Sequence, residues 1–375
     1  MSIVISPDRD AAARRAARRL DRPARARYGL RVRALPVAAN RSRTEIRRAL
    51  RLSLEIARDA WLTRRPFLLY YKPTARCDCR CRICDRWQRP SLRDEELPLP
   101  VVAEILARFR RAGAAVLTMW GGEPLLREDL PRILAAAREL GYRTSLCTNG
   151  RRLAEQAAEI APLLDVLLCS LDAFGPDHDE LRGVRGLFER VVSGIEAAKR
   201  HARCDVKIWA VLHRQNREHI AKLARLAADL GVGIEFFPLG RIPGHNEDLA
   251  LGAEERREVF GLVHELKRDG LPIRNPDRAL ALMRDGRPFR CNFPRIAISF
   301  DHRGTVHTCE DPQGTPLHVW GPQHEIDPAA LYRSREYRAV TRQLESCNRC
   351  TLPCVSELAG SLPSALADML LSRTG

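Results

Sequence analysis

The sequence predicts an α/β fold: a partial (β/α)6 barrel of the TIM type with an N-terminal helical arm and a small C-terminal cysteine-rich module of a hairpin and helices. Three observations indicate this division. Residues 66–286 alternate short apolar runs of strand length with longer amphipathic segments, which is the pattern of parallel β–α units. Residues 1–65 are rich in arginine, and residues 287–375 contain a second group of cysteines after the one near residue 80.

The N-terminal arm, residues 1–65, holds 18 arginines and 6 acidic residues, a net charge of +12 out of +16 for the whole chain. Within it, residues 44–62 place Ile46, Leu50 and Leu54 at helical spacing. We expect an amphipathic helix that packs its apolar face against the body of the protein. Two alternatives are a peripheral contact of its basic face with an anionic membrane and a contact with nucleic acid.

Six strands and the helices between them make up the predicted barrel. The strands are expected at 67–71, 114–119, 143–147, 164–171, 205–212 and 232–237. The helices are expected at 98–112, 128–140, 153–161, 187–201, 217–230 and 254–269. Six units fall short of the eight of a closed barrel, so the barrel is predicted to be partial. Near the end of the sixth strand, Glu235 and Arg241 could face the interior, and Glu235 could equally be a salt-bridge partner.

The C-terminal segment begins with RIAISFDHRGTVHTC, which is typical of a β-hairpin that turns at Arg303-Gly304. A helix is expected near 329–345, just before CNRCTLPC. His302 and His307 lie on this hairpin, where an isolated histidine is more often a surface residue than a metal ligand.

The composition excludes several classes of protein. With 45% hydrophobic and 29% charged residues, the chain of 375 residues can bury a core and is not expected to be disordered. No apolar run approaches the roughly 18 residues of a membrane span, and no secretory signal is evident. We therefore expect a cytoplasmic protein. Its twelve cysteines are clustered rather than spread, which favours metal or iron–sulfur ligation over disulfides.

The first cysteine cluster, PTARCDCRCRICDRW, follows the first strand and spaces Cys77, Cys81 and Cys84 by three and then two intervening residues. Three thiolates on a tight loop can hold three irons of a 4Fe–4S cube and leave the fourth iron open. A zinc knuckle is the alternative, although zinc usually takes four protein ligands. Cys79 also lies in this loop and is expected to be a bystander.

The second cysteine cluster offers five thiols for one further site. The hairpin would bring two distant cysteines together, and three more follow the predicted helix: Cys291, Cys309, Cys347, Cys350 and Cys354. Four of these thiolates could equally hold a structural zinc ion.

The cysteine loop and the strand ends that follow it resemble the radical S-adenosylmethionine (radical SAM) superfamily. Over residues 67–237 the chain has, in the order of that family, TMWGGEPLLRED, LCTNG, LLCSLDAFGPDHDELRG and VKIWAVLHRQN. The resemblance implies that Cys77, Cys81 and Cys84 bind a 4Fe–4S cluster whose open iron is chelated by the methionine group of S-adenosylmethionine (SAM). Relatives often have an aromatic residue where this chain has Ile83, so the surroundings of the adenine could differ.

The same resemblance implies a set of residues that contact SAM. Residues near the methionine amino group are expected to be Gly121, Gly122, Glu123 and Pro124, and those near the ribose or carboxylate Thr148, Asn149 and Ser170. Each of the last three could instead cap a turn or a strand end.

The spacing of Cys291, Gly304 and Cys309 resembles the opening of the SPASM and twitch auxiliary-cluster modules. This resemblance implies one auxiliary 4Fe–4S cluster. Its expected ligands are Cys291, Cys309, Cys347 and Cys350, with Cys354 as an alternative to either of the last two.

The resemblance implies a radical SAM enzyme, in which the reduced cluster cleaves SAM to a 5′-deoxyadenosyl radical that abstracts a substrate hydrogen. An external electron donor of the flavodoxin or ferredoxin type would be a partner. The substrate could be a small molecule of specialised biosynthesis, a ribosomal peptide, or a lipid or isoprenoid at the membrane surface. No catalytic residue is assigned.

The competing function of another class is a zinc-stabilised nucleic-acid-binding protein that uses the basic arm. Aromatic residues make up only 6% of the chain and form no evident stacking platform. That reading also leaves the ordered strand-end motifs unexplained, so a nucleic-acid partner is not expected.

Overall fold

The computed structural model describes residues 65–201, 204–286, 291–310 and 316–347. They form one nine-stranded sheet in the order β6-β5-β4-β3-β2-β1-β7-β8-β9. Neighbouring strands from β1 to β6 are parallel. These six are β1 (Leu68–Tyr71), β2 (Val116–Met119), β3 (Arg143–Thr148), β4 (Val166–Ser170), β5 (Asp205–Leu212) and β6 (Gly233–Pro238). The predicted partial barrel is confirmed.

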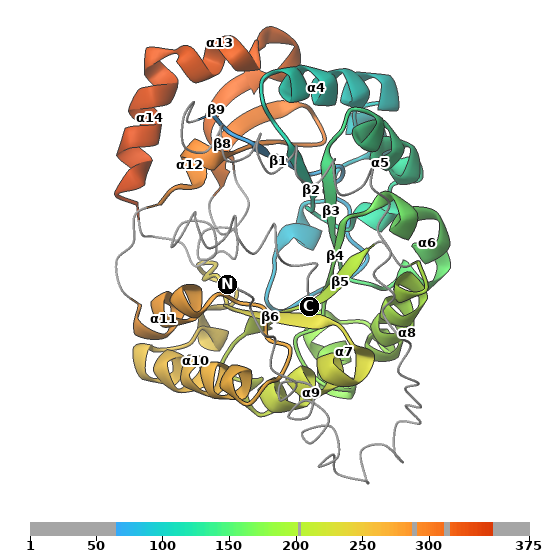
Figure 1. Cartoon of the computed structure of the whole chain (residues 1–375), viewed down its shortest axis with the longest axis vertical. Coiled ribbons are helices and arrows are strands. Elements are labelled where there is room, and N and C mark those ends of the chain that lie inside the picture. Colours follow the sequence, from blue (N-terminus) through green and yellow to red (C-terminus); the bar gives the residue numbers. More distant parts are fainter. Residues whose placement is uncertain (1–64, 202–203, 287–290, 311–315, 348–375) are drawn as a thin grey trace, which may run out of the picture.

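Helices surround the outside of these strands (Figure 1). The predicted ones are α4 (Leu99–Arg111), α5 (Leu130–Glu139), α6 (Leu153–Ile160), α8 (Leu187–Lys199), α9 (Ile220–Leu230) and α10 (Ala253–Arg268). Strand side chains alternate between two faces. In β5, for example, Val206 and Ile208 are buried, whereas Lys207 and Trp209 on the opposite face are only partly buried.

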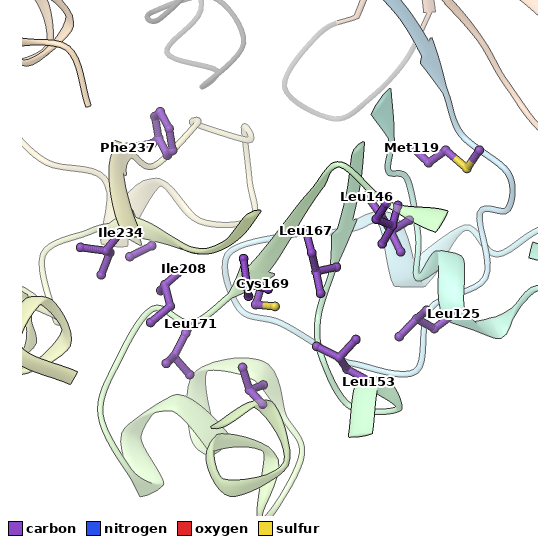
Figure 2. Close-up of a cluster of buried hydrophobic side chains, with 14 of the residues drawn as sticks. Met119, Leu125, Leu146, Leu153, Leu167, Cys169, Leu171, Ile208, Ile234 and Phe237 are labelled. Carbon is purple, nitrogen blue, oxygen red and sulfur yellow. The ribbon is translucent and has the colours of Figure 1, made fainter. Parts of the chain in front are cut away.

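The main hydrophobic core lies between the strands and the helices. Figure 2 shows part of it, in which Leu146, Leu167 and Ile208 come from three successive strands. Each of these side chains is fully buried. This packing fixes the strands and therefore the loops that leave their carboxyl ends, where the predicted site lies.

Several elements were not predicted from the sequence. They are α7 (Pro176–Arg182), α11 (Asp277–Asp285), α12 (Phe293–Ile296) and β9 (Pro316–Pro322). Short 3-10 turns also occur at η2 (Arg86–Gln88), η3 (Arg93–Glu95), η4 (Pro124–Leu126), η5 (Ala161–Leu163), η6 (Arg217–His219), η7 (Glu247–Leu249) and η8 (Gln323–Glu325).

The single helix expected near 329–345 is two helices, α13 (Pro328–Arg333) and α14 (Arg335–Glu345). Ser334 separates them because its backbone is extended, with φ −64° and ψ 153°. Its hydroxyl accepts a hydrogen bond from the backbone N–H of Tyr337, so it caps the second helix.

The C-terminal hairpin is part of the barrel sheet. β7 (Ala297–Phe300) pairs in parallel with β1, and β8 (Thr305–Glu310) and β9 continue the sheet in antiparallel fashion. The Phe300 ring stacks on Tyr71 at 4.2 Å between ring centroids. In Figure 1 the hairpin lies beside β1, with α13 and α14 next to it. The sheet therefore continues across the domain boundary expected near residue 286.

The predicted amphipathic helix at 44–62 lies outside the described residues, as does the arm up to residue 64. None of the helices that the structure describes is long and apolar enough to cross a membrane.

Candidate cluster and cofactor site

The first cysteine loop follows β1 and lies at the carboxyl ends of the parallel strands. Cys79 and Cys81 are buried, and Cys77 and Cys84 are half-buried. The four thiols are close enough to interact. Burial and, to a smaller extent, the charge of Cys81 raise the pKa of Cys77 and Cys84, and a hydrogen bond to Cys81 is the largest cause that raises the pKa of Cys79. A group of buried and half-buried thiols around one central cysteine is a donor set that fits an iron–sulfur cluster.

Cys81 is the most acidic thiol of the loop. A hydrogen bond from Cys79 and the positive charge of Arg182 lower its pKa to about 7, although burial opposes this. The Arg182 Nη1 atom lies 3.8 Å from the Cys81 sulfur. Burial, by contrast, raises the pKa of Cys77 to about 12. Cys81 is therefore the thiol that most readily becomes the thiolate that ligation requires.

Gly121 and Gly122 bring the end of β2 against the cysteine loop. The Gly122 N–H donates to the carbonyl of Thr74 at 3.1 Å, and the next N–H donates to the carbonyl of Arg76 at 2.7 Å. A Cβ atom on Gly122 would lie 2.1 Å from that Arg76 oxygen, which is too close for any Cβ atom, so a side chain does not fit at this position. Gly121 has a φ of +134°, a conformation that favours glycine. The two glycines thus position the backbone just before Cys77.

Glu123 is a buried carboxyl group held at the end of β3. It accepts hydrogen bonds from the Thr148 hydroxyl at 2.7 Å, the Asn149 N–H at 2.7 Å and the Leu125 N–H at 3.0 Å. Burial raises its pKa to about 7 even though these bonds lower it. Pro124 is buried in the same turn. The sequence-predicted residues Glu123, Thr148 and Asn149 therefore come together.

Asn149 also braces the cysteine loop. Its side-chain amide donates to Asp78 Oδ1 at 2.8 Å, and Arg151 and Arg152 lie 3.8 and 3.7 Å from Asp78 Oδ2. Ser170, at the end of β4, is half-buried. It forms a hydrogen bond with the thiol of Cys147. Burial raises the pKa of this thiol, and the hydrogen bond with Ser170 lowers it by a smaller amount.

The helix α7 supports the loop from another side. Asp172 is fully buried and pairs with Arg182, with its Oδ2 2.6 Å from Nη2 and 2.7 Å from Nε. The backbone N–H of Arg80 donates to the Arg182 carbonyl at 3.0 Å. The sequence of this stretch matched a motif, but the ion pair between Asp172 and Arg182 was not predicted from it. Its only sign in the sequence is an acidic residue shortly before a short helix and an arginine at the end of that helix.

A buried ionic cluster that the sequence did not reveal lies beside the loop. Glu310 Oε1 lies 2.9 Å from Lys72 Nζ and 2.9 Å from His307 Nε2, and its Oε2 lies 3.3 Å from Arg86 Nη2. Burial raises the pKa of Glu310, but the His307 hydrogen bond and the two cations outweigh it and lower the pKa to about 2. His307 is fully buried, so the expectation of a surface histidine was wrong at this position.

Glu235 and Arg241 do not act together. Glu235 forms a salt bridge with Lys207 at 2.7 Å and accepts a hydrogen bond from the Trp209 indole. Arg241 is exposed, and its Nη2 lies 3.5 Å from the carbonyl of Leu251. Of the two readings of Glu235, the salt-bridge partner is the one observed.

Part of the second cysteine cluster is described. The backbone N–H of Cys291 donates to the Glu345 carbonyl at 3.0 Å, two residues before Cys347, so these two cysteines lie near the same helix end. Cys309 is half-buried near the end of β8. Cys350 and Cys354 lie outside the described residues.

Known proteins are similar to this chain in both sequence and fold. A family model described as the Radical SAM superfamily matches residues 71–227. A GTP 3′,8-cyclase of Acidothermus cellulolyticus is 32% identical over 264 residues, which are 63% of this chain and 72% of that protein. A GTP 3′,8-cyclase of Marinobacter nauticus is 32% identical over 203 residues, 52% of this chain. The chain spans only 61% of the length of that second relative.

The fold is also found in a solved structure. The crystal structure of Streptococcus suis SuiB bound to the precursor peptide SuiA has a TM-score of 0.63 and 18% sequence identity. The similarity covers 90% of this chain and 81% of that one. At this identity the likeness concerns the fold alone.

Proposed function

Because the chain belongs to the radical SAM superfamily, we propose that Cys77, Cys81 and Cys84 hold its 4Fe–4S cluster and that it modifies a substrate of specialised biosynthesis by hydrogen abstraction. The observation that carries the proposal is the loop of interacting thiols at the exit of β1. When bound by these three cysteines, the cluster would supply the electron for the reductive cleavage of SAM, which is the source of the hydrogen-abstracting radical.

The residues around the loop have separate tasks in this proposal. Arg182 places a positive charge next to Cys81 and stabilises its thiolate. Gly122 fixes the backbone before Cys77. Glu123, whose two oxygens are held by Thr148, Leu125 and Asn149, fixes the turn that would lie along the methionine amino group of SAM.

The other predicted contacts of SAM extend this wall. We assign Gly121 and Pro124 to the methionine side and Ser170 to the ribose or carboxylate side, since they lie at the ends of β2 and β4. Ligands are bound at this edge of a parallel barrel.

An auxiliary 4Fe–4S cluster in the C-terminal module is part of the proposal. Its ligands would be Cys291, Cys309, Cys347 and Cys350, with Cys354 as an alternative to either of the last two. The nearness of Cys291 to the end of α14 supports the first and third of these.

The substrate class is proposed from the relatives' names. The cyclases are named for GTP, and SuiB was solved with a peptide, so a small molecule and a ribosomal peptide are the two candidates. A flavodoxin- or ferredoxin-like donor would supply electrons. Deuterium transfer from labelled candidates into 5′-deoxyadenosine distinguishes the two classes.

The experiment that tests the cluster assignment uses cysteine variants of the reconstituted protein. Cys77→Ala is expected to abolish the formation of 5′-deoxyadenosine while the circular dichroism spectrum is retained, and Cys204→Ala, a control at a half-buried thiol just before β5 and outside the loop, is expected to keep it. Cys291→Ala or Cys309→Ala should remove about half of the iron, from roughly eight to four atoms per chain. A Cys77→Ala variant that still makes 5′-deoxyadenosine at the parent rate would refute the assignment, and a colourless zinc protein would refute the function.

A further inference from the structure

The buried cluster around Glu310 joins two parts of the chain that carry cysteines. Lys72 lies immediately after β1 and five residues before Cys77, whereas Arg86 lies two residues after Cys84. Glu310 itself follows Cys309 directly. One carboxylate therefore holds both flanks of the first cysteine loop and the strand end that carries a cysteine of the second site.

Each arm of this cluster is well defined. Lys72 is 7% exposed, and its backbone N–H donates to the carbonyl of Phe300 at 3.0 Å, so β7 also fixes it. On the other side, the guanidinium of Arg86 lies over the Trp120 ring at 4.8 Å. Trp120 immediately precedes Gly121, and its indole N–H is buried without a hydrogen-bond partner among the described residues. The Arg86 arm thus reaches the end of β2 as well.

The charges in the cluster depend on one another. Lys72 and Glu310 are both almost completely buried, so neither charge is compensated by water if its partner is removed. Replacing the carboxylate by an amide would place an amide NH2 group against at least one of the donors Lys72, Arg86 and His307. The two flanks of the loop would then lose the shared group that holds them to β8.

We propose that Glu310 is a positioning residue that holds the Cys77–Cys84 loop and the Cys309 strand end in one fixed arrangement. The contacts that carry this proposal are independent of the clusters. Its meaning for catalysis rests on the proposed function, because the same carboxylate would fix the auxiliary cluster relative to the first one and carries its negative charge one residue from Cys309. Net charge near a cluster is one of the determinants of its reduction potential.

The test compares Glu310→Gln with Glu325→Gln in the reconstituted protein. Glu325 lies in the same C-terminal part, but its side chain is 66% exposed and, among the described residues, it forms an ion pair only with the exposed His324. Amide hydrogen exchange over residues 72–86 is expected to become about tenfold faster or more in Glu310→Gln and to stay unchanged in the control. Glu310→Asp, which keeps the charge, should restore part of the protection.

A second readout concerns the clusters. Redox titration followed by electron paramagnetic resonance should show a less negative potential for the auxiliary cluster in Glu310→Gln and no change in Glu325→Gln. If Glu310→Gln does not fold, Arg86→Gln is measured instead, because it removes only one of the partners of Glu310. Amide hydrogen exchange is then expected to be faster only over residues 84–88.

The outcomes separate this proposal from the proposed function. Unchanged exchange over residues 72–86 in a folded Glu310→Gln variant, or over 84–88 in Arg86→Gln, overturns the positioning role even if the enzyme is active. A wild-type protein that assembles no cluster overturns the proposed function, whereas faster exchange in Glu310→Gln would still support the role of the carboxylate in holding the loop.

Discussion

Gly122, at the exit of β2, has no room for a side chain, because an added Cβ would lie 2.1 Å from the Arg76 oxygen. We expect Gly122→Ala to lower the free energy of unfolding by at least about 2 kcal/mol, because backbone on both sides must shift. Gly261→Ala, at a half-buried position of α10 with nothing near the new Cβ, should raise it by up to about 1 kcal/mol. Urea unfolding followed by circular dichroism measures both, and equal midpoints would contradict the clash.

Glu123 gives the stability of the protein a recognisable pH dependence. Its pKa is about 7 when folded and 4.5 ordinarily, so between these values the folded chain binds a proton that the unfolded chain has lost. The contribution of Glu123 to the free energy of unfolding therefore falls as pH rises through this range, by about 1.4 kcal/mol per pH unit. Glu123→Gln should lack this slope. Parallel curves of unfolding free energy against pH for the two proteins would show that the carboxyl is not protonated.

Several polar and charged residues have roles that the sequence does not reveal. The resemblance to the family's strand-end motifs selected Thr148 and Asn149 as contacts of SAM, but a role in holding Glu123 requires the same residue types. Lys72 and Glu310 were not selected, since a pair so far apart in the chain leaves no local pattern. Short cysteine spacings, by contrast, are local and were recognised directly.

Among the elements, the six barrel strands were predictable because all except β3 (RTSLCT) are short and largely apolar runs, and their limits agree with the structure to within two residues. The helix α7 was missed because PDHDELR has only one large apolar residue and no amphipathic period. The pairing of β7 with β1 was missed for another reason. AISF suits a hairpin and a buried parallel strand equally well, and only the tertiary packing of Phe300 on Tyr71 selects the second.

The junction of β7 with β1 can be tested at Phe300. Phe300→Ala removes a fully buried ring that stacks on Tyr71 and Phe109, so we expect the free energy of unfolding to fall by about 3–5 kcal/mol. Val319→Ala on β9 is the control, because Val319 is 52% exposed and should change the stability by less than about 0.5 kcal/mol. Chemical denaturation decides, and a similar small loss in both variants would mean that β7 contributes little to the core.

For the molecule as a whole, the continuous sheet predicts that residues 1–286 do not fold independently. Without β7, β8 and β9, the strand β1 becomes an exposed edge of the sheet, and such edges promote aggregation. The truncated chain should aggregate in size-exclusion chromatography, and co-expression of residues 287–375 should recover a defined species. A monomeric 1–286 fragment with cooperative unfolding would show instead that the C-terminal module is separable.

The position of β7 next to β1 also sets an order of events during biosynthesis. The ribosome releases residues 68–71 long before residues 297–300, and at about 5–20 residues per second the delay is on the order of tens of seconds. Throughout that interval the cysteine loop of the nascent chain follows β1 while this strand still lacks its neighbour β7. If iron and sulfide are delivered to this loop during synthesis, they would meet a completed sheet only after residues 297–300 have been released and paired with β1.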